Sequence, residues 1–155
     1  MLKMNLRLVV LVFLLTISCA RNKPVEVYQK FENQVWPRYQ TLKFEIPVIK
    51  PGNTYDIILF ANITRVFSFE TLDFNMVMNT PAGEERINEY QIKIKSPVGS
   101  FLGKCDKDSC IYTIPLKKGL SINDSGILKI EIENLTPRIE TSGILGMGVR
   151  LIKSD

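Results

Sequence analysis

Apolar residues recur at every second position over most of the chain beyond residue 24. The pattern is clearest over residues 42–48, 55–63, 72–78, 90–94, 112–116, 128–132 and 147–151. Such alternation places successive side chains on opposite faces of a sheet, so each segment predicts a β-strand with one buried face. The turn sequences Pro51-Gly52-Asn53 and Pro81-Ala82-Gly83 separate neighbouring segments.

Details of the pattern predict where individual strands lie. Pro47 cannot donate a backbone hydrogen bond, so the 42–48 strand is expected at a sheet edge. Ile58 and Phe60 make the 55–63 strand apolar on both faces, which predicts a central position. The register of apolar residues shifts near Thr71, and we expect a bulge or two short strands there.

The whole pattern favours an all-β fold. No segment carries apolar residues at helical spacing over three turns. Seven or eight short strands with turns between them predict an antiparallel two-sheet β-sandwich, jelly-roll-like in its connections. A small lipocalin-like barrel is the alternative.

The amino terminus has a different character. Lys3 and Arg7 precede an apolar run over residues 8–15, and Cys19 follows Ser18. The run is too short to cross a bilayer, and the layout is that of a lipoprotein signal peptide, in which the cysteine thiol accepts the lipid. We therefore expect a cleaved signal peptide at 1–18, a lipidated tether at 19–26 and a β-sandwich domain at 27–155. An ordinary signal peptide cleaved after Ala20 is the alternative.

The side of the membrane follows from the residues after Cys19. Residues 20–23 contain Arg21 and Lys23 and no acidic residue, whereas surface lipoproteins of Bacteroidetes resemble one another in an acidic cluster there. This predicts a lipid anchor in the outer membrane, on its periplasmic face, through which the protein contacts the membrane.

Two further cysteines remain once Cys19 carries lipid. Cys105 and Cys110 flank a polar stretch typical of a hairpin tip, and a disulfide could join them. Free thiols are the second interpretation. A metal loop with Asp106 or Asp108 is the third, although the spacing is not that of a structural zinc site.

Composition narrows the function classes. The chain contains no histidine, which excludes Ser-His-Asp and Cys-His relays and His-ligated metals. The formal net charge is +4, with Lys3 and Arg7 inside the signal peptide, so a nucleic-acid partner is not expected. Glu84 and Glu85 are interpreted as solvent-exposed residues of a hairpin rather than as a catalytic carboxylate pair. We expect no enzyme, no cofactor, no metal and no small-molecule substrate.

Several segments together form a recognisable set: Phe31 and Trp36, the Phe44 strand, the 55–59 segment leading to Arg65, Phe67, Phe69, Leu72, the 81–83 turn, the 99–103 segment and the 143–153 ending. In these features the chain resembles the gliding-motility lipoprotein family called GldH, found in Bacteroidetes. Thr71 and the pair Leu135-Thr136 depart from the family pattern, and Cys105 and Cys110 look peculiar to this chain. The resemblance implies an outer-membrane lipoprotein that acts with envelope proteins of the gliding or secretion machinery, without catalytic activity.

Two residues are candidates for an interaction surface. Trp36 could anchor a partner, although burial at one end of the sandwich is the favoured interpretation. Arg65, between strands, could pair with a carboxylate or protect a sheet edge. A carbohydrate-binding module is the alternative function, with Trp36, Tyr39, Phe67 and Tyr90 as a stacking platform.

Overall fold

The computed structural model describes residues 24–154, and the predicted signal peptide and Cys19 lie outside them. The strands are β1 (Val25–Lys30), β2 (Val35–Pro37), β3 (Leu42–Val48), β4 (Asn53–Thr64), β5 (Thr71–Asn79), β6 (Glu85–Lys93), β7 (Lys104–Cys105), β8 (Ser109–Ile122), β9 (Gly126–Asn134), β10 (Glu140–Ser142) and β11 (Ile144–Lys153). One short 3-10 helix, η1 (Glu32–Gln34), follows β1. Within this described part, no helix has the length and apolar character needed to span a bilayer.

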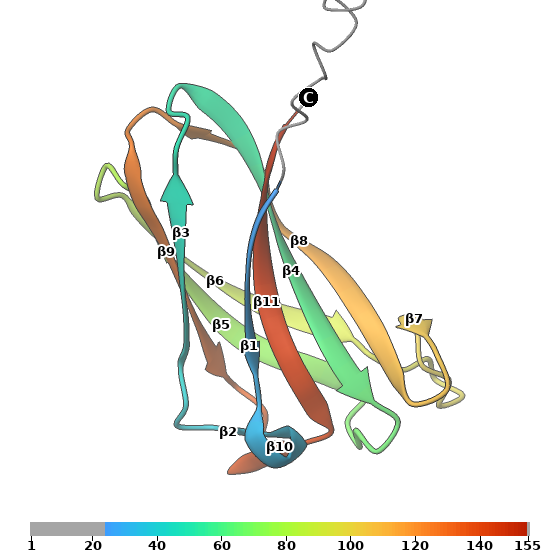
Figure 1. The fold of residues 1–155 in the computed structure, drawn as a ribbon. Coiled ribbons are helices and arrows are strands. Elements are labelled where there is room, and N and C mark those ends of the chain that lie inside the picture. Colours follow the sequence, from blue (N-terminus) through green and yellow to red (C-terminus); the bar gives the residue numbers. More distant parts are fainter. Residues whose placement is uncertain (1–23, 155) are drawn as a thin grey trace, which may run out of the picture.

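The strands form two main sheets that face each other (Figure 1). One sheet has five strands in the order β1-β11-β4-β8-β7, and the other has four in the order β3-β9-β5-β6. The antiparallel pairs β1–β11, β3–β9, β4–β8 and β5–β6 are nested along the chain, with β11–β4 and β9–β5 joining them. This is the strand order of a jelly roll, so the predicted sandwich is confirmed.

Alternation along the strands produces the core. In β3 the burial pattern is strictly alternating, with Phe44 and Ile46 fully buried and Lys43 and Glu45 exposed. The expected edge position of β3 and central position of β4 are both confirmed by the sheet orders. The inner faces of the two sheets therefore meet in one hydrophobic core.

The structure differs from the sequence pattern at one loop and at three strands. Residues 65–70 form a loop rather than a bulge or a short strand, although Phe67 in that loop is buried. The strands β1, β2 and β10 were not expected, and β1 begins at Val25, inside the segment predicted as tether. Long-range pairing explains all three strands, since β1 pairs with β11, and β2 pairs with β10 in a separate two-stranded sheet.

Trp36 closes one end of the sandwich. Its side chain is 0% exposed, stacks on Phe31 and donates from Nε1 to the carbonyl of Gln40 at 2.8 Å. The Trp36 carbonyl accepts a hydrogen bond from Asn134 Nδ2 at 3.1 Å. Trp36 therefore holds β2 against the core and is not a surface residue.

Asn134 is the centre of a buried polar network beneath Trp36. Its Nδ2 also donates to Thr141 Oγ1 at 3.0 Å, while its Oδ1 accepts from the backbone N–H and the hydroxyl of Thr136 at 2.9 and 2.6 Å. Each polar atom of the Asn134 side chain thus has a partner, which a buried amide requires. The network links β9 to the β2–β10 pair.

We expect Asn134→Ala to lower the free energy of unfolding by at least about 2 kcal/mol, because the Trp36 carbonyl and two threonine hydroxyls lose a buried partner. Chemical denaturation measures the change. The matched control is Asn88→Ala at an exposed position of β6, which should change stability by less than about 0.5 kcal/mol. Equal losses in the two variants would contradict the network.

Candidate interaction site

A disulfide-closed hairpin forms one corner of the five-stranded sheet. Strands β7 and β8 pair through Cys105 and Cys110, and the two cysteines are joined by a disulfide with their Cα atoms 3.9 Å apart. Cys110 is buried, whereas Cys105 is exposed. The bond therefore fastens the outer strand β7 to a strand that belongs to the core.

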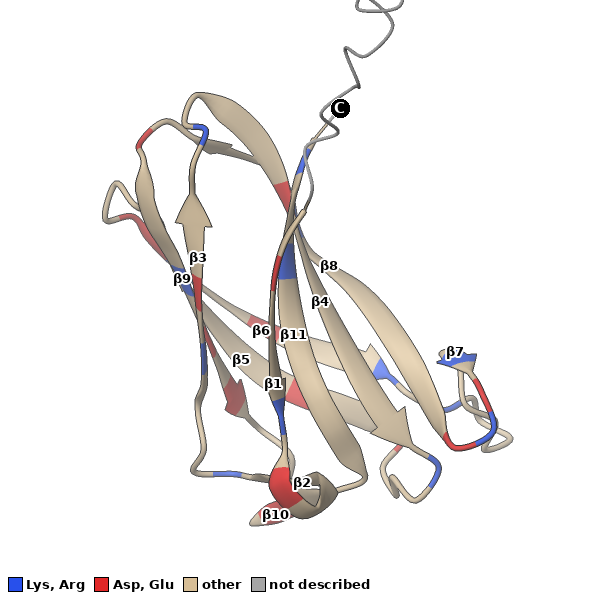
Figure 2. Cartoon of the chain, viewed as in Figure 1, with Lys and Arg blue, Asp and Glu red and all other residues tan. Residues whose placement is uncertain are grey.

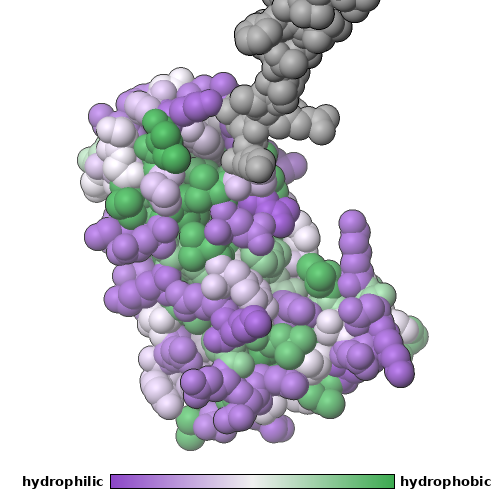
Figure 3. All heavy atoms as spheres, in the orientation of Figure 1, coloured by the Kyte–Doolittle hydropathy of each residue, from purple (hydrophilic) through white to green (hydrophobic). Residues whose placement is uncertain are grey.

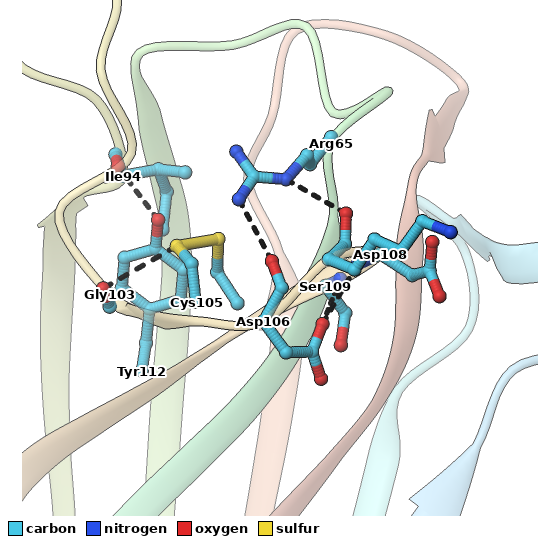
Figure 4. Close-up of a disulfide and its surroundings, with 10 residues drawn as sticks. Arg65, Ile94, Gly103, Cys105, Asp106, Asp108, Ser109 and Tyr112 are labelled. Carbon is cyan, nitrogen blue, oxygen red and sulfur yellow. Dashed lines mark hydrogen bonds between the residues drawn. A yellow bond between two sulfur atoms is a disulfide. The ribbon is translucent and has the colours of Figure 1, made fainter.

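Arg65, directly after the neighbouring strand β4, holds the tip of this hairpin (Figure 4). Its Nη2 donates to the carbonyl of Asp106 at 2.9 Å, and its Nε donates to the carbonyl of Lys107 at 3.2 Å. The forked guanidinium suits two neighbouring acceptors. Arg65 thus binds backbone carbonyls, and neither expectation from the sequence, a carboxylate partner or edge protection, describes that contact.

Asp106 shapes the turn at the hairpin tip. Its Oδ1 accepts hydrogen bonds from the backbone N–H groups of Ser109 at 2.7 Å and Asp108 at 2.9 Å. These donors favour the charged form, so the pKa of the Asp106 carboxyl lies below its usual value. The side chain stays ionised at neutral pH and keeps its role as an acceptor.

The hairpin rests on the segment between β6 and β7. The Tyr112 hydroxyl donates to the carbonyl of Ile94 at 2.8 Å, and burial raises the pKa of that phenol. A Cβ on Gly103 would lie 2.8 Å from the Tyr112 ring, so only glycine fits at this crossing. The 94–103 loop is thereby packed against β8.

Cationic and apolar side chains gather on the same corner. The Arg65 guanidinium carbon lies 6.0 Å from the centre of the Phe101 ring, and Lys95 Nζ lies 5.0 Å from it. Lys95 also donates to the carbonyl of Phe67 at 2.6 Å. Val98 and Leu102 in the adjoining loop are exposed. This arrangement, called the hairpin corner below, combines a rigid backbone with exposed apolar and charged groups.

The candidate site residues predicted from the sequence lie in different parts of the structure. Arg65, Cys105 and Cys110 come together at the hairpin corner, while Trp36 lies in the interior beside β10. Cys19 lies outside the described residues. Lys95 and Phe101 were not anticipated, because only the loop conformation brings them to Arg65.

The four aromatic residues suggested as a sugar platform do not form one. Trp36 and Phe67 are buried, Tyr90 is stacked on Phe74, and only Tyr39 is well exposed. A different pair, Tyr28 and Phe60, lies nearly parallel on the outer face of the five-stranded sheet, with planes 8° apart. The Arg150 guanidinium lies over the Phe60 ring, 5.4 Å from its centre.

The acidic residues singled out by the sequence lie on a surface hairpin, as expected. Glu84 pairs with Arg86 at 2.8 Å, and this hydrogen bond lowers the pKa of the Glu84 carboxyl. Among residues 24–154, no three histidine, cysteine or acidic side chains are grouped to hold a metal ion. Both hairpin thiols are engaged in the disulfide.

We expect the variant Cys105→Ala/Cys110→Ala to fold but to lose about 2 kcal/mol of unfolding free energy, since the short loop is no longer closed in the unfolded chain. Denaturant titration measures the loss. The wild-type protein treated with a reductant is the control for the cavity left at the buried Cys110 position, and it should show a similar loss. A variant as stable as the oxidised protein would contradict this assignment.

Comparison with known proteins places the chain in a family. Residues 24–151 match the family model described as GldH lipoprotein. The gliding motility lipoprotein GldH of Flavobacterium johnsoniae is 20% identical over 158 residues, covering 97% of this chain and 98% of that protein.

A structural resemblance also exists, and it is weak. A chain in the structure of the infectious bursal disease virus Gx strain aligns with a TM-score of 0.36 and 11% identity, over 86% of this chain and 33% of that one. The match to the family model, by contrast, extends from the residue before β1 into β11 and so includes both main sheets. The chain therefore belongs to the GldH lipoprotein family.

Proposed function

We propose that this protein is a non-enzymatic lipoprotein of the cell envelope, anchored by acyl chains on Cys19 to the periplasmic face of the outer membrane. In this role it is a structural or interaction component of gliding or secretion machinery. The observation that carries the proposal is the family match over residues 24–151, which begins five residues after the predicted lipid-acceptor Cys19.

The anchor is supported by the residues that precede the fold. A single acyl chain binds a membrane reversibly, and stable anchoring needs a second chain or a basic patch. Cys19 is followed by Arg21 and Lys23, and β1 begins at Val25. The sandwich therefore starts almost at the membrane, joined by a short basic segment.

The interaction role is supported by the hairpin corner. Arg65 and the disulfide fix the backbone of the tip, so a partner would meet a preformed surface rather than order a loop on binding. Exposed Val98 and Leu102 supply apolar contact area beside Lys95 and Arg65. Such a mixture of apolar and charged groups suits an envelope protein as partner.

The anchor is tested with Cys19→Ser expressed in a bacterium that processes lipoproteins. We expect the variant to lose incorporation of a clickable palmitate analogue and to move from the membrane to the soluble fraction, because the hydroxyl replaces the thiol that accepts the lipid. The matched control is Ala20→Ser, which changes the alternative cleavage position and keeps the thiol. A Cys19→Ser variant that still incorporates the label and sediments with membranes would refute the proposal.

The same cells test the side of the membrane. Protease added to intact cells should leave the anchored protein whole, and should digest it after the outer membrane is permeabilised. Digestion in intact cells would place the protein on the outer surface.

A further inference from the structure

A narrow groove of about 150 Å³ opens between the two sheets where β1 begins. Val25, Val48, Tyr55 and Leu151 supply apolar walls. Lys50 and Lys153 also line it. In Figure 3 hydrophobic atoms gather along the opening between β3 and β1, toward this end of the molecule.

The groove exists because β1 and β3 are edge strands of different sheets and run past each other without pairing. A hydrogen bond joins the end of β1 to the start of β3, because Gln29 Nε2 donates to the carbonyl of Lys43 at 2.6 Å. Val25 and Val48 lie at the opposite ends of β1 and β3. The sheets are therefore joined at the far end of the crevice and open at the end nearest the amino-terminal tether.

The rim of the groove carries an exposed apolar residue between basic ones. The Ile49 side chain is 76% exposed, and Lys50 and Lys153 are also exposed. The turn that carries Ile49 is fixed, because the carbonyl of Lys50 accepts hydrogen bonds from the Tyr55 hydroxyl at 2.7 Å and from Asn53 Nδ2 at 3.1 Å. Figure 2 shows the basic positions at the ends of β3 and β11.

Asp56, which follows the groove residue Tyr55, accepts hydrogen bonds from two neutral donors. Asp56 Oδ1 accepts hydrogen bonds from the Ser154 hydroxyl at 2.6 Å and from the backbone N–H of Gly119 at 2.8 Å. These donors lower the pKa of the Asp56 carboxyl, which stays charged, but Asp56 does not line the groove. The charged side chains that line the groove are those of Lys50 and Lys153. The combination of these lysines with apolar walls matches the boundary between phospholipid headgroups and acyl chains.

We propose that this end of the sandwich docks on the surface of a phospholipid bilayer. Ile49 enters the boundary of the acyl region, Lys50 and Lys153 meet headgroup phosphates, and the groove receives part of one acyl chain. The proposal rests on the proposed anchor at Cys19, because the segment from Cys19 to Val25 spans at most about 20 Å when fully extended. That length keeps the groove beside the bilayer.

The test places an environment-sensitive fluorophore at two matched isoleucines. Ile49→Cys and Ile139→Cys are each labelled with the nitrobenzoxadiazole (NBD) group in the acylated protein, with the natural disulfide intact. Ile139 is 75% exposed and lies just before β10, at the opposite end of the sandwich. Both proteins are reconstituted into vesicles of phosphatidylethanolamine and phosphatidylglycerol.

On reconstitution, the fluorophore at position 49 should brighten severalfold, shift its emission to the blue and be quenched by spin-labelled lipid. The fluorophore at position 139 should keep its emission in water. Equal responses at the two positions, whether both aqueous or both lipid-exposed, would overturn the docking geometry.

Charge variants separate the headgroup contact from anchoring alone. At high lipid concentration the unacylated Cys19→Ser protein should keep a weak residual affinity for these vesicles. Lys50→Gln/Lys153→Gln should weaken that residual sedimentation by about tenfold, whereas the control Lys30→Gln/Lys107→Gln should change it by less than about twofold. Equal losses in the two pairs would overturn the headgroup contact.

Failure of the anchor and failure of the docking are distinguishable. A wild-type protein that carries no acyl label and does not sediment with membranes contradicts the proposed function. An acylated, vesicle-bound protein with an aqueous signal at position 49 contradicts only the inference about docking.

Discussion

The pairing of the first strand with the last is the interaction on which the rest of the structure depends. Strand β1 pairs with β11 from Val25↔Leu151 to Lys30↔Gly146, and this pairing adds the start of the domain to the edge of the five-stranded sheet. Glycines in β11 make it possible, since a Cβ at Gly146 or Gly148 would collide with Tyr28 or Phe60 and with the β1 backbone. The pair Arg150–Glu26, at 2.6 Å, connects the same two strands on the surface.

This pairing gives the sandwich two different ends. The amino-terminal segment and the end of β11 lie together beside the groove between β1 and β3. The hairpin tip pairs with the end of β4 at Thr64↔Ser109, and the groove lies near the β4 start. In the arrangement that we propose, the anchored protein would turn its groove toward the bilayer and its hairpin corner toward proteins farther away.

Local patterns in the sequence predicted the strands whose alternation is complete. The strands at residues 42–48 and 55–63 were predicted correctly, because one face of each strand is buried and its residues alternate with more exposed ones. The turn at Pro81-Ala82-Gly83 was also predictable, because Gly83 adopts a φ of +84° that favours glycine. Strand β1 was not predicted, and its first two residues fell within the predicted tether, because the strand depends on pairing with β11, more than a hundred residues away. The contact of Arg65 with the hairpin carbonyls likewise joins segments far apart in the chain, and no local pattern encodes it. Trp36 shows the same limit, since a lone tryptophan fits either a core or an interface until its neighbours are known.

Neutron reflectometry on the acylated protein at a supported bilayer is the decisive experiment for docking, because it measures where protein lies along the membrane normal. We expect protein density on one side only, beginning at the headgroups without an intervening water layer. Protein density within the hydrocarbon region, or a layer of water between the headgroups and the sandwich, would contradict it.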